Sequence, residues 1–237
     1  MLKRIPLDNV LNLRDLGGYP IGRGQMTKWK TIFRADGIFE LSENDVDFML
    51  DYCKIKSVID LRSQKEQTAK PNTFSSYDGI KYFNIPLISE DADFFFVNWA
   101  KIDDIYERVV DVSMNNIKAI FGAIAGSLPD PVLYHCTAGK DRTGIISVLL
   151  LGVCGVDGFD IAGDYEVSSN YIRRNIRKIL AHDEQIDEEM LSSRAATVRN
   201  LMTGIDKKFG SIQNYLNKTG INNETIDKIK SNFVINY

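Results

Sequence analysis

Short apolar runs alternate with amphipathic stretches along the first two thirds of the chain. Four of the apolar runs have the length and composition of buried strands: residues 31–35, 57–61, 80–86 and 132–135. Each is separated from the next by a segment with helical spacing, and such alternation favours crossover connections between parallel strands. The pattern therefore predicts an α/β fold whose central, mostly parallel four-stranded sheet is flanked by helices.

Start and stop signals delimit the helices between these strands. The expected helices span residues 42–52, 63–70, 104–127 and 145–153. The first has Ser42 as its N-cap and Asp45 as a capping-box acid, and Pro71 ends the second. The third has the pattern of one long amphipathic helix, whereas the fourth is apolar enough to be buried on all sides.

The last third of the chain, from Gly158 onward, is helical in pattern and is interrupted by a charged break at residues 182–189. It contains neither an internal repeat nor a low-complexity segment. We therefore expect one domain, residues 1–237, with a core at 12–170 that carries the motifs described below and a helical C-terminal part at 171–237.

The composition is that of a soluble protein with a sizeable core. Of the 237 residues 44% are hydrophobic, and the formal net charge of -3 without a basic tract argues against nucleic acid as a partner. The first residues carry two cations but no apolar stretch long enough for a signal sequence, and no segment reaches membrane-spanning length. These features predict a cytoplasmic monomer without stable membrane insertion.

Three cysteines, Cys53, Cys136 and Cys154, stand at unrelated positions. They show neither the spacing of metal ligands nor an even number for disulfides, so we expect a reducing compartment and neither metal nor cofactor. Cys53 and Cys154 have the surroundings of core residues. Cys136, in contrast, lies in a segment between a predicted strand and a predicted helix.

The segment from His135 to Gly144 joins the last predicted strand to a buried helix and places Cys136 shortly before Arg142. Successive backbone amides of such a loop form a concave nest of donors, and the helix adds its positive N-terminal end. A phosphate would bind there, and the same field favours the thiolate of Cys136, which is a nucleophile. Arg142 offers a planar fork for two phosphoryl oxygens.

Other residues of the segment fit the same chemistry. Gly139 permits a backbone conformation that other residues resist, Thr143 places a hydroxyl near the sulfur, and His135 is expected to orient the nucleophile rather than act as a base. The expected phosphate-binding residues are Thr137, Ala138, Gly139, Lys140, Asp141 and Arg142. The alternative is that Cys136 is an ordinary buried side chain and Arg142 a surface cation, but a cation at a helix N-terminus needs an anion.

The loop and its preceding histidine resemble the signature of the protein tyrosine phosphatase superfamily. Residues 138–144, together with 12–19 and 33–36, resemble its bacterial branch, typified by mycobacterial protein tyrosine phosphatase B and the Listeria tyrosine/lipid phosphatase. The resemblance implies a metal-free phosphatase and a phosphatase-like fold, and some relatives are secreted. It also suggests a lid formed by part of the C-terminal region with the aromatic stretch 94–99, unless these aromatic side chains are ordinary core residues.

Such a reaction needs an acid for the leaving group and a base for the water that hydrolyses the phosphocysteine. Three carboxylates compete for this double role. Asp141 within the loop ranks first, and the resemblance favours it. Asp60, at the end of a predicted strand, ranks second, and Asp103 or Asp104 ranks third because its spacing resembles that of eukaryotic dual-specificity enzymes. For Asp141 the alternative is a charge that complements the helix dipole.

Lys140 is expected to influence which substrate is bound, because a cation in the loop attracts a second negative group beside the phosphate. Its pattern with Ala138 and Gly139 also resembles that of phosphoinositide phosphatases. The alternative is a solvated loop cation. Arg14 is expected to brace the loop, with substrate contact as its alternative.

The sequence thus predicts a phosphatase acting on phosphotyrosine in proteins, extending to phosphoserine, phosphothreonine or phosphoinositides. The alternatives are a phosphoinositide phosphatase, a non-catalytic phosphate-binding module and a rhodanese-like transferase, whose loop lacks this continuation.

Overall fold

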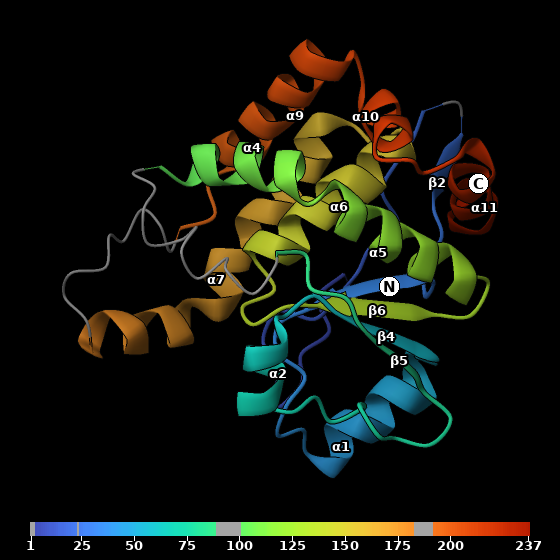
Figure 1. Cartoon of the computed structure of the whole chain (residues 1–237). Coiled ribbons are helices and arrows are strands. Elements are labelled where there is room, and N and C mark those ends of the chain that lie inside the picture. The colour runs from blue at the N-terminus through green and yellow to red at the C-terminus, as the bar shows by residue number, and fades with distance from the viewer. Residues whose placement is uncertain (1–2, 23, 89–100, 183–191) are drawn as a thin grey trace.

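A five-stranded sheet crosses the centre of the computed structural model, which describes residues 3–22, 24–88, 101–182 and 192–237 (Figure 1). The strand order is β1 (Arg14–Asp15), β3 (Ile32–Ala35), β6 (Val132–His135), β4 (Ser57–Asp60) and β5 (Lys81–Asn84). β3, β6, β4 and β5 run parallel to one another and are the four predicted strands, so the mostly parallel α/β prediction is confirmed. β1 runs antiparallel to β3. It was not predicted, because a strand of two residues is too short to show an alternation of polar and apolar positions.

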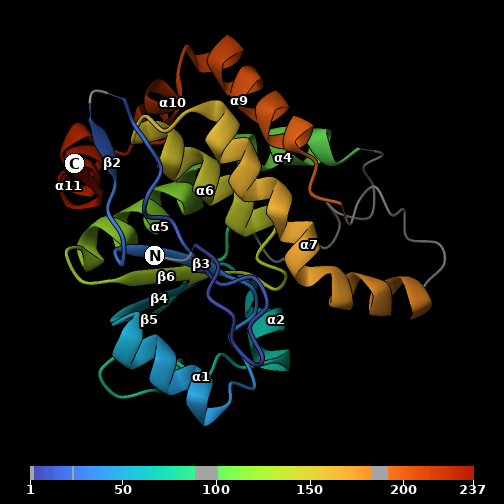
Figure 2. The ribbon, with the colours of Figure 1, turned by 180° about the vertical axis from the view of Figure 1, so that it is seen from behind.

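Alternate residues of the strands enter two separate cores. In β4, Val58 belongs to the core that includes α1 (Glu43–Asp47) and its π-helical continuation η1 (Phe48–Tyr52). Ile59 belongs to the core on the other face, with α5 (Met114–Ser127) and α6 (Asp141–Val153). Figure 2 shows the helices on both faces of the sheet. Burial on both faces explains why the strands appear as nearly continuous apolar runs.

Two short helices begin as the sequence predicts. Ser42 caps α1 through the amide of Asp45, whose carboxylate bonds back to the Ser42 amide. Ser63 and Glu66 form the same reciprocal pair at the start of α2 (Gln64–Ala69). The second capping box fixes the place of Glu66 at the end of the sheet.

The predicted single helix at residues 104–127 is wrong, because two helices, α4 (Ile102–Val112) and α5, meet at Ser113. Ser113 has φ −99° and ψ 18°, outside the helical region, although its amide still donates to the carbonyl of Val109. The helical period continues across this turn because both helices turn their apolar sides to the same core. The spacing of apolar residues in the sequence therefore does not show that one helix ends and another begins here.

The C-terminal region is helical, as predicted. It contains α7 (Gly158–His182), α9 (Ala195–Phe209), α10 (Ile212–Lys218) and α11 (Asn223–Phe233). α9 packs against α4 and α7, and the last strand, β7 (Val234–Asn236), pairs with β2 (Gln25–Thr27). Residues 183–189 of the charged break and the aromatic stretch 94–99 lie outside the described residues, so the lid stays a prediction.

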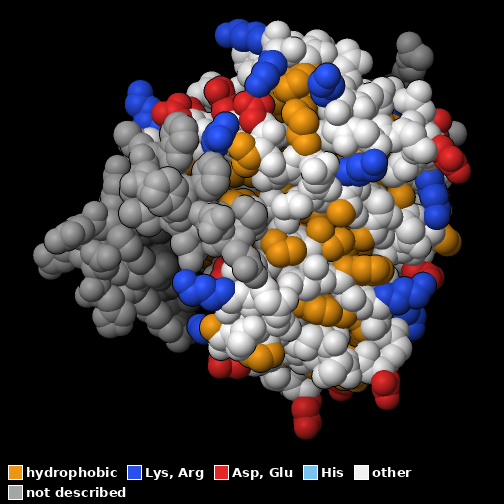
Figure 3. All heavy atoms as spheres, in the orientation of Figure 1, with side chains coloured by type: hydrophobic (Ala, Val, Ile, Leu, Met, Phe, Trp, Pro, Cys, Tyr) orange, Lys and Arg blue, Asp and Glu red, His pale blue; other side chains and the backbone are white. Residues whose placement is uncertain are grey.

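The surface is mixed in character. Figure 3 shows the hydrophobic side chains of one face in small groups among polar atoms, with charged side chains of both signs around them.

The thiols of Cys53, Cys136 and Cys154 are free and buried. In the described part of the chain, no helix combines the length and the apolar character that a membrane crossing requires.

Candidate active site

The predicted phosphate loop lies at the carboxyl end of β6 and leads into the first turn of α6, the place where parallel sheets collect their ligands. Cys136 begins the loop and is only 2% exposed. Gly139 has φ 64°, and a Cβ on it would lie 2.5 Å from the carbonyl oxygen of Ala35. Glycine is therefore required here, since the loop passes directly against the end of β3.

Side chains from outside the loop hold its carbonyl oxygens. The Asn12 amide nitrogen donates to the carbonyls of Ala138 and Gly139, each at 3.1 Å, and Arg34 donates to that of Gly139 at 2.7 Å. The C=O and N–H groups of one trans peptide unit point in opposite directions, so a carbonyl held on the outer side of the loop turns the amide of the following residue to the concave side. This arrangement provides the donor nest that an oxyanion needs.

Beneath the loop, two buried arginines share one buried carboxylate. Asp164 of α7 accepts from Arg14 Nε at 3.0 Å, from Arg34 Nη1 at 2.5 Å and from the Tyr19 hydroxyl at 2.9 Å. Burial alone would raise the pKa of Asp164, but the two guanidinium groups hold it well below its usual range. Arg14, itself buried, also donates to the side chain of Asn12. Arg14 therefore reaches the loop through Asn12, and its role as a brace stays a prediction.

Arg142 is oriented by a carboxylate on α2. Its Nη1 and Nη2 donate to the two oxygens of Glu66 at 2.6 and 2.8 Å, and Glu66 also accepts from the Thr137 hydroxyl at 2.6 Å. Burial would raise the pKa of Glu66, but the bonds from Arg142 and Thr137 lower it to about 2. Nη2 also donates to the Thr137 hydroxyl at 3.2 Å, so the bonds to Glu66 and Thr137 use the two terminal nitrogens of Arg142 and not Nε.

Asp141 is the first residue of α6, and its side chain is 25% exposed. Its Oδ1 accepts from the Tyr106 hydroxyl at 2.8 Å and lies 3.3 Å from Lys140 Nζ. The Tyr106 hydroxyl is also 2.8 Å from that of Tyr165. Lys140 is buried and donates to the carbonyl of Ser192 at 3.0 Å, so the interpretation of Lys140 as a solvated loop cation is wrong.

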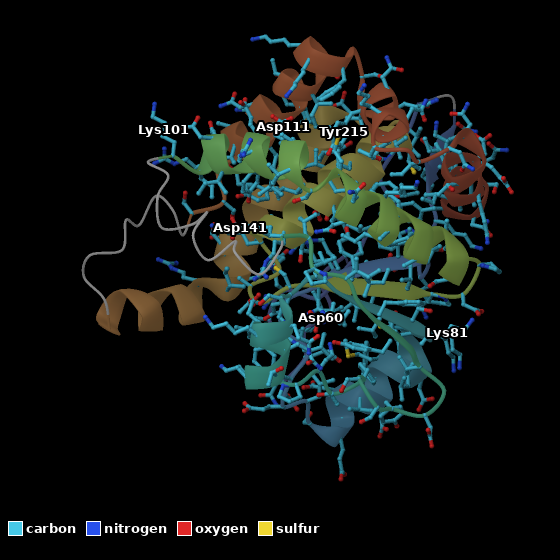
Figure 4. All side chains as sticks on the ribbon, in the orientation of Figure 1. Asp60, Lys81, Lys101, Asp111, Asp141 and Tyr215 are labelled. Carbon is cyan, nitrogen blue, oxygen red and sulfur yellow. The ribbon has the colours of Figure 1, made fainter. Side chains whose placement is uncertain are left out.

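His135 at the end of β6 and Asp60 at the end of β4 are both fully buried, and Figure 4 labels Asp60. His135 Nδ1 lies 3.1 Å from the carbonyl oxygen of Cys136, and its Nε2 lies 2.7 Å from the Asn72 amide nitrogen. Burial lowers the pKa of His135, so the neutral ring with its proton on Nδ1 satisfies both contacts. Asp60 is paired with Arg62 at 2.7 Å. These contacts fix the orientation of the His135 ring, and its role toward Cys136 stays a prediction.

The remaining candidates differ in their relation to the loop. The Thr143 hydroxyl is buried and has no hydrogen-bond partner among the described residues, so it is available to a thiolate or a ligand. Asp104 is exposed, and Asp103 accepts from Asn200 of α9 at 2.7 Å. These two carboxylates lie at the start of α4, whose contribution to the loop is Tyr106.

Comparison with known proteins decides the family. The sequence model of the tyrosine phosphatase family matches residues 5–235. The chain belongs to this family. A tyrosine-protein phosphatase of Nostoc commune is 28% identical over 194 residues, which are 74% of this chain and 65% of the relative. The triple specificity protein phosphatase PtpB of Mycobacterium tuberculosis is 30% identical over 117 residues, 42% of each chain.

The match therefore covers less than two thirds of the length of either relative. Among solved structures, the Siw14 catalytic core has a TM-score of 0.43 at 15% identity, covering 80% of this chain and 88% of that one. A complex of P. aeruginosa TpbA with phosphotyrosine has a TM-score of 0.38 at 14% identity, covering 70% and 95%. The family assignment rests on the sequence match, which confirms the resemblance seen in the loop.

Several side chains that contact the loop or its supports belong to none of the predicted site residues. Asn12 and Arg34 lie within the segments 12–19 and 33–36 that carry the resemblance. Glu66 has a signal in the sequence, since it is the acid of a capping box directly after a strand end. Asp164 is a carboxylate within the buried side of α7, and such a residue needs a cationic partner. Tyr106 lies on the apolar side of α4 and has no separate signal. Within the described residues, no group of His, Cys, Asp and Glu side chains could hold a metal ion.

Proposed function

We propose that the chain is a cysteine-dependent phosphatase that hydrolyses phosphotyrosine in proteins, with Cys136 carrying the phosphoryl group as a phosphocysteine. The strongest support is one juxtaposition. Cys136 begins a loop whose carbonyls are held outward, and Arg142, oriented by Glu66, stands at the end of the same loop. Membership in the tyrosine phosphatase family supports the same reaction.

In the first step the Cys136 thiolate attacks phosphorus, and the S–P bond forms as the bond from phosphorus to the tyrosyl oxygen breaks. The loop amides and Arg142 stabilise the negative charge on the phosphoryl oxygens. Asp141 gives a proton to the departing oxygen and then takes one from the water that hydrolyses the phosphocysteine. The Thr143 hydroxyl donates to the sulfur as it leaves as a thiolate.

Asp141 fits the acid role better than Asp60 does. The Asp60 carboxylate has no exposed surface and is engaged by Arg62 at 2.7 Å and by the Tyr82 hydroxyl at 3.0 Å. Burial would raise the pKa of Asp60, but the charge and hydrogen bonds of Arg62 hold it below its usual value. Asp60 is therefore ionised, out of reach of a substrate, and acts as a support for Arg62.

Phosphotyrosine is the substrate we put first. Lys140, on which the extension to phosphoinositides depends, directs its Nζ to the Ser192 carbonyl and to Asp141. A second phosphate would have to compete with these contacts for the lysine. The activities on phosphoserine, phosphothreonine and phosphoinositides are therefore proposed as secondary.

The test compares Asp141→Asn with the wild type on two substrates, a phosphotyrosine peptide and an aryl phosphate whose phenolate leaves without a proton. We expect kcat/KM, which covers the steps up to release of the leaving group, to fall about a hundredfold on the peptide and far less on the aryl phosphate. Cys136→Ser should have no turnover on either. Equal losses in Asp141→Asn would reject the acid role, and turnover by Cys136→Ser would reject the mechanism. Phosphoinositides are assayed alongside, and a higher kcat/KM on them would replace phosphotyrosine as the main substrate.

A further inference from the structure

Two tyrosine hydroxyls form a buried chain that ends on the proposed acid. We propose that Tyr106 is a positioning residue that holds Oδ1 of Asp141, so that the transferable proton resides on Oδ2, and that Tyr165 fixes the direction of the Tyr106 hydroxyl. The proposal rests on the proposed function of Asp141 as the acid. It assigns a role to two residues that carry no motif.

Counting hydrogens fixes the direction of each bond. An ionised carboxylate only accepts, so the Tyr106 hydroxyl, 2.8 Å away, donates to Asp141 Oδ1. That hydroxyl has one hydrogen, so Tyr165 is the donor in the 2.8 Å contact between the two tyrosines. Oδ1 is thereby kept as an acceptor. When the carboxyl group is protonated, its hydrogen is directed to Oδ2.

The two tyrosines keep their protons throughout the reaction. Both are buried, and their rings pack edge to face with centroids 6.1 Å apart. Burial, together with the charge of Asp141, raises the pKa of both phenols well above the ordinary value. In the transfer itself, the Oδ2–H bond breaks and the proton goes to the leaving oxygen. The Tyr106 hydroxyl remains on Oδ1 before and after this step.

The charged groups around the Asp141 carboxyl group also distinguish Oδ1 from Oδ2. Lys140 Nζ lies 3.3 Å from Oδ1, the oxygen that already accepts from the tyrosine. Arg142, the next residue of α6, is the second cation that feels the carboxylate. The charged and titratable groups around Arg142 and Tyr165 also include Cys136, Glu66, Asp103 and Arg34. Among the described residues, the Tyr106 hydroxyl and the Lys140 ammonium group both lie against Oδ1, and the proposal assigns Oδ2 to the leaving group.

The experiment measures pH–rate profiles of kcat/KM for Tyr106→Phe and the wild type, on the phosphotyrosine peptide and on the aryl phosphate. Phenylalanine keeps the ring and removes only the hydroxyl. We expect kcat/KM on the peptide to fall about tenfold, the value of one hydrogen bond to a charged group, with less than about a twofold change on the aryl phosphate. Because the variant lacks a donor that stabilises the ionised carboxylate, the alkaline limb of the peptide profile should move to higher pH.

Tyr215→Phe is the matched control, because it removes another buried tyrosine hydroxyl. That hydroxyl donates to the carbonyl of Val110 at 2.6 Å, and Tyr215 lies away from Asp141 in Figure 4. We expect this control to leave unchanged both the alkaline limb and the ratio of kcat/KM between the two substrates. Tyr165→Phe leaves Tyr106 its bond to Asp141, so its effect on that ratio should be smaller than that of Tyr106→Phe.

The outcomes separate the two proposals. If Tyr106→Phe loses activity equally on both substrates and its alkaline limb does not move, while Asp141→Asn remains selective for the peptide, the positioning role is wrong and the proposed function stands. If Asp141→Asn loses activity equally on both substrates, both proposals are wrong. A selective loss together with a shifted limb in Tyr106→Phe would establish the positioning role.

Discussion

Asp164 is the counter-charge of two buried arginines, so replacing it by asparagine perturbs the site from beneath without touching Cys136. Asparagine keeps the shape of the side chain and removes its charge. In Asp164→Asn, Arg14 Nε and Arg34 Nη1 lose the carboxylate oxygens that now lie 3.0 and 2.5 Å away. Two like charges then remain close together in the core, where their repulsion is poorly screened.

The expected loss of stability follows from the burial of this cluster. Removing one partner of a buried ion pair costs about 3–5 kcal/mol, and here a single carboxylate serves two arginines. For a chain of this size, 1 kcal/mol shifts Tm by about 2–4 °C, so the variant should melt about 6–20 °C below the wild type. Part of the loss should also appear as a lower kcat/KM, because Arg34 holds the Gly139 carbonyl of the loop.

The assay is urea unfolding followed by fluorescence, together with thermal melting, on Asp164→Asn and on a matched surface variant, Asp111→Asn. Asp111 pairs with Lys208 at 2.7 Å, but the lysine side chain is 56% exposed, so its loss should cost less than about 1 kcal/mol. A loss in Asp164→Asn no larger than in Asp111→Asn would refute the reasoning. It would mean that the two arginines do not depend on this carboxylate.

The stability difference between the wild type and Asp164→Asn should depend on pH in a definite direction. The folded pKa of Asp164 lies below its unfolded value of about 3.9, so its contribution to stability is fully present above that value. The contribution is lost as pH falls towards the folded pKa. The stability difference between the wild type and Asp164→Asn should therefore be constant from about pH 5 upward and should shrink below about pH 4.

Two further predictions concern the loop itself. Thr143→Val should lower kcat about tenfold while leaving the free energy of unfolding within about 0.5 kcal/mol of the wild type, because the hydroxyl has no partner to lose; a large stability loss would contradict this. Glu66→Gln should lower kcat/KM for the aryl phosphate about tenfold, because Arg142 loses two charged hydrogen bonds that orient it. A lower KM in Glu66→Gln would instead mean that Glu66 competes with phosphate for Arg142.

The parts of this fold that the sequence predicts are those with a local signal. The four parallel strands carry continuous apolar runs, and the starts of α1 and α2 carry capping boxes, so both are found correctly. The break at Ser113 is missed because the apolar period continues across it. β1 is missed because its two residues are held by contacts with β3 rather than by their own pattern.

The residues of the candidate site also fall into those with a local signal in the sequence and those without one. Cys136, Arg142 and Gly139 lie within one short segment, where spacing alone indicates their chemistry. Glu66, Tyr106 and Asp164 reach the loop from three different helices, and only the tertiary structure brings them to it. The sequence leaves the choice between Asp60 and Asp141 as a ranking. The burial of Asp60 against Arg62 supplies the physical reason to prefer Asp141.

The contacts that hold the loop carbonyls connect distant parts of the chain. Asn12 reaches Gly139 across 127 residues, Arg34 reaches it across 105, and Arg14 meets Asp164 across 150. A phosphate site can therefore form only after the first strands and α7 have come together, because until then the loop lacks the groups that draw its carbonyls outward. During synthesis, catalytic competence would appear late, when α7 has been made and has docked. An incomplete chain would contain Cys136 but no phosphate site, which ties the appearance of activity to completion of the fold.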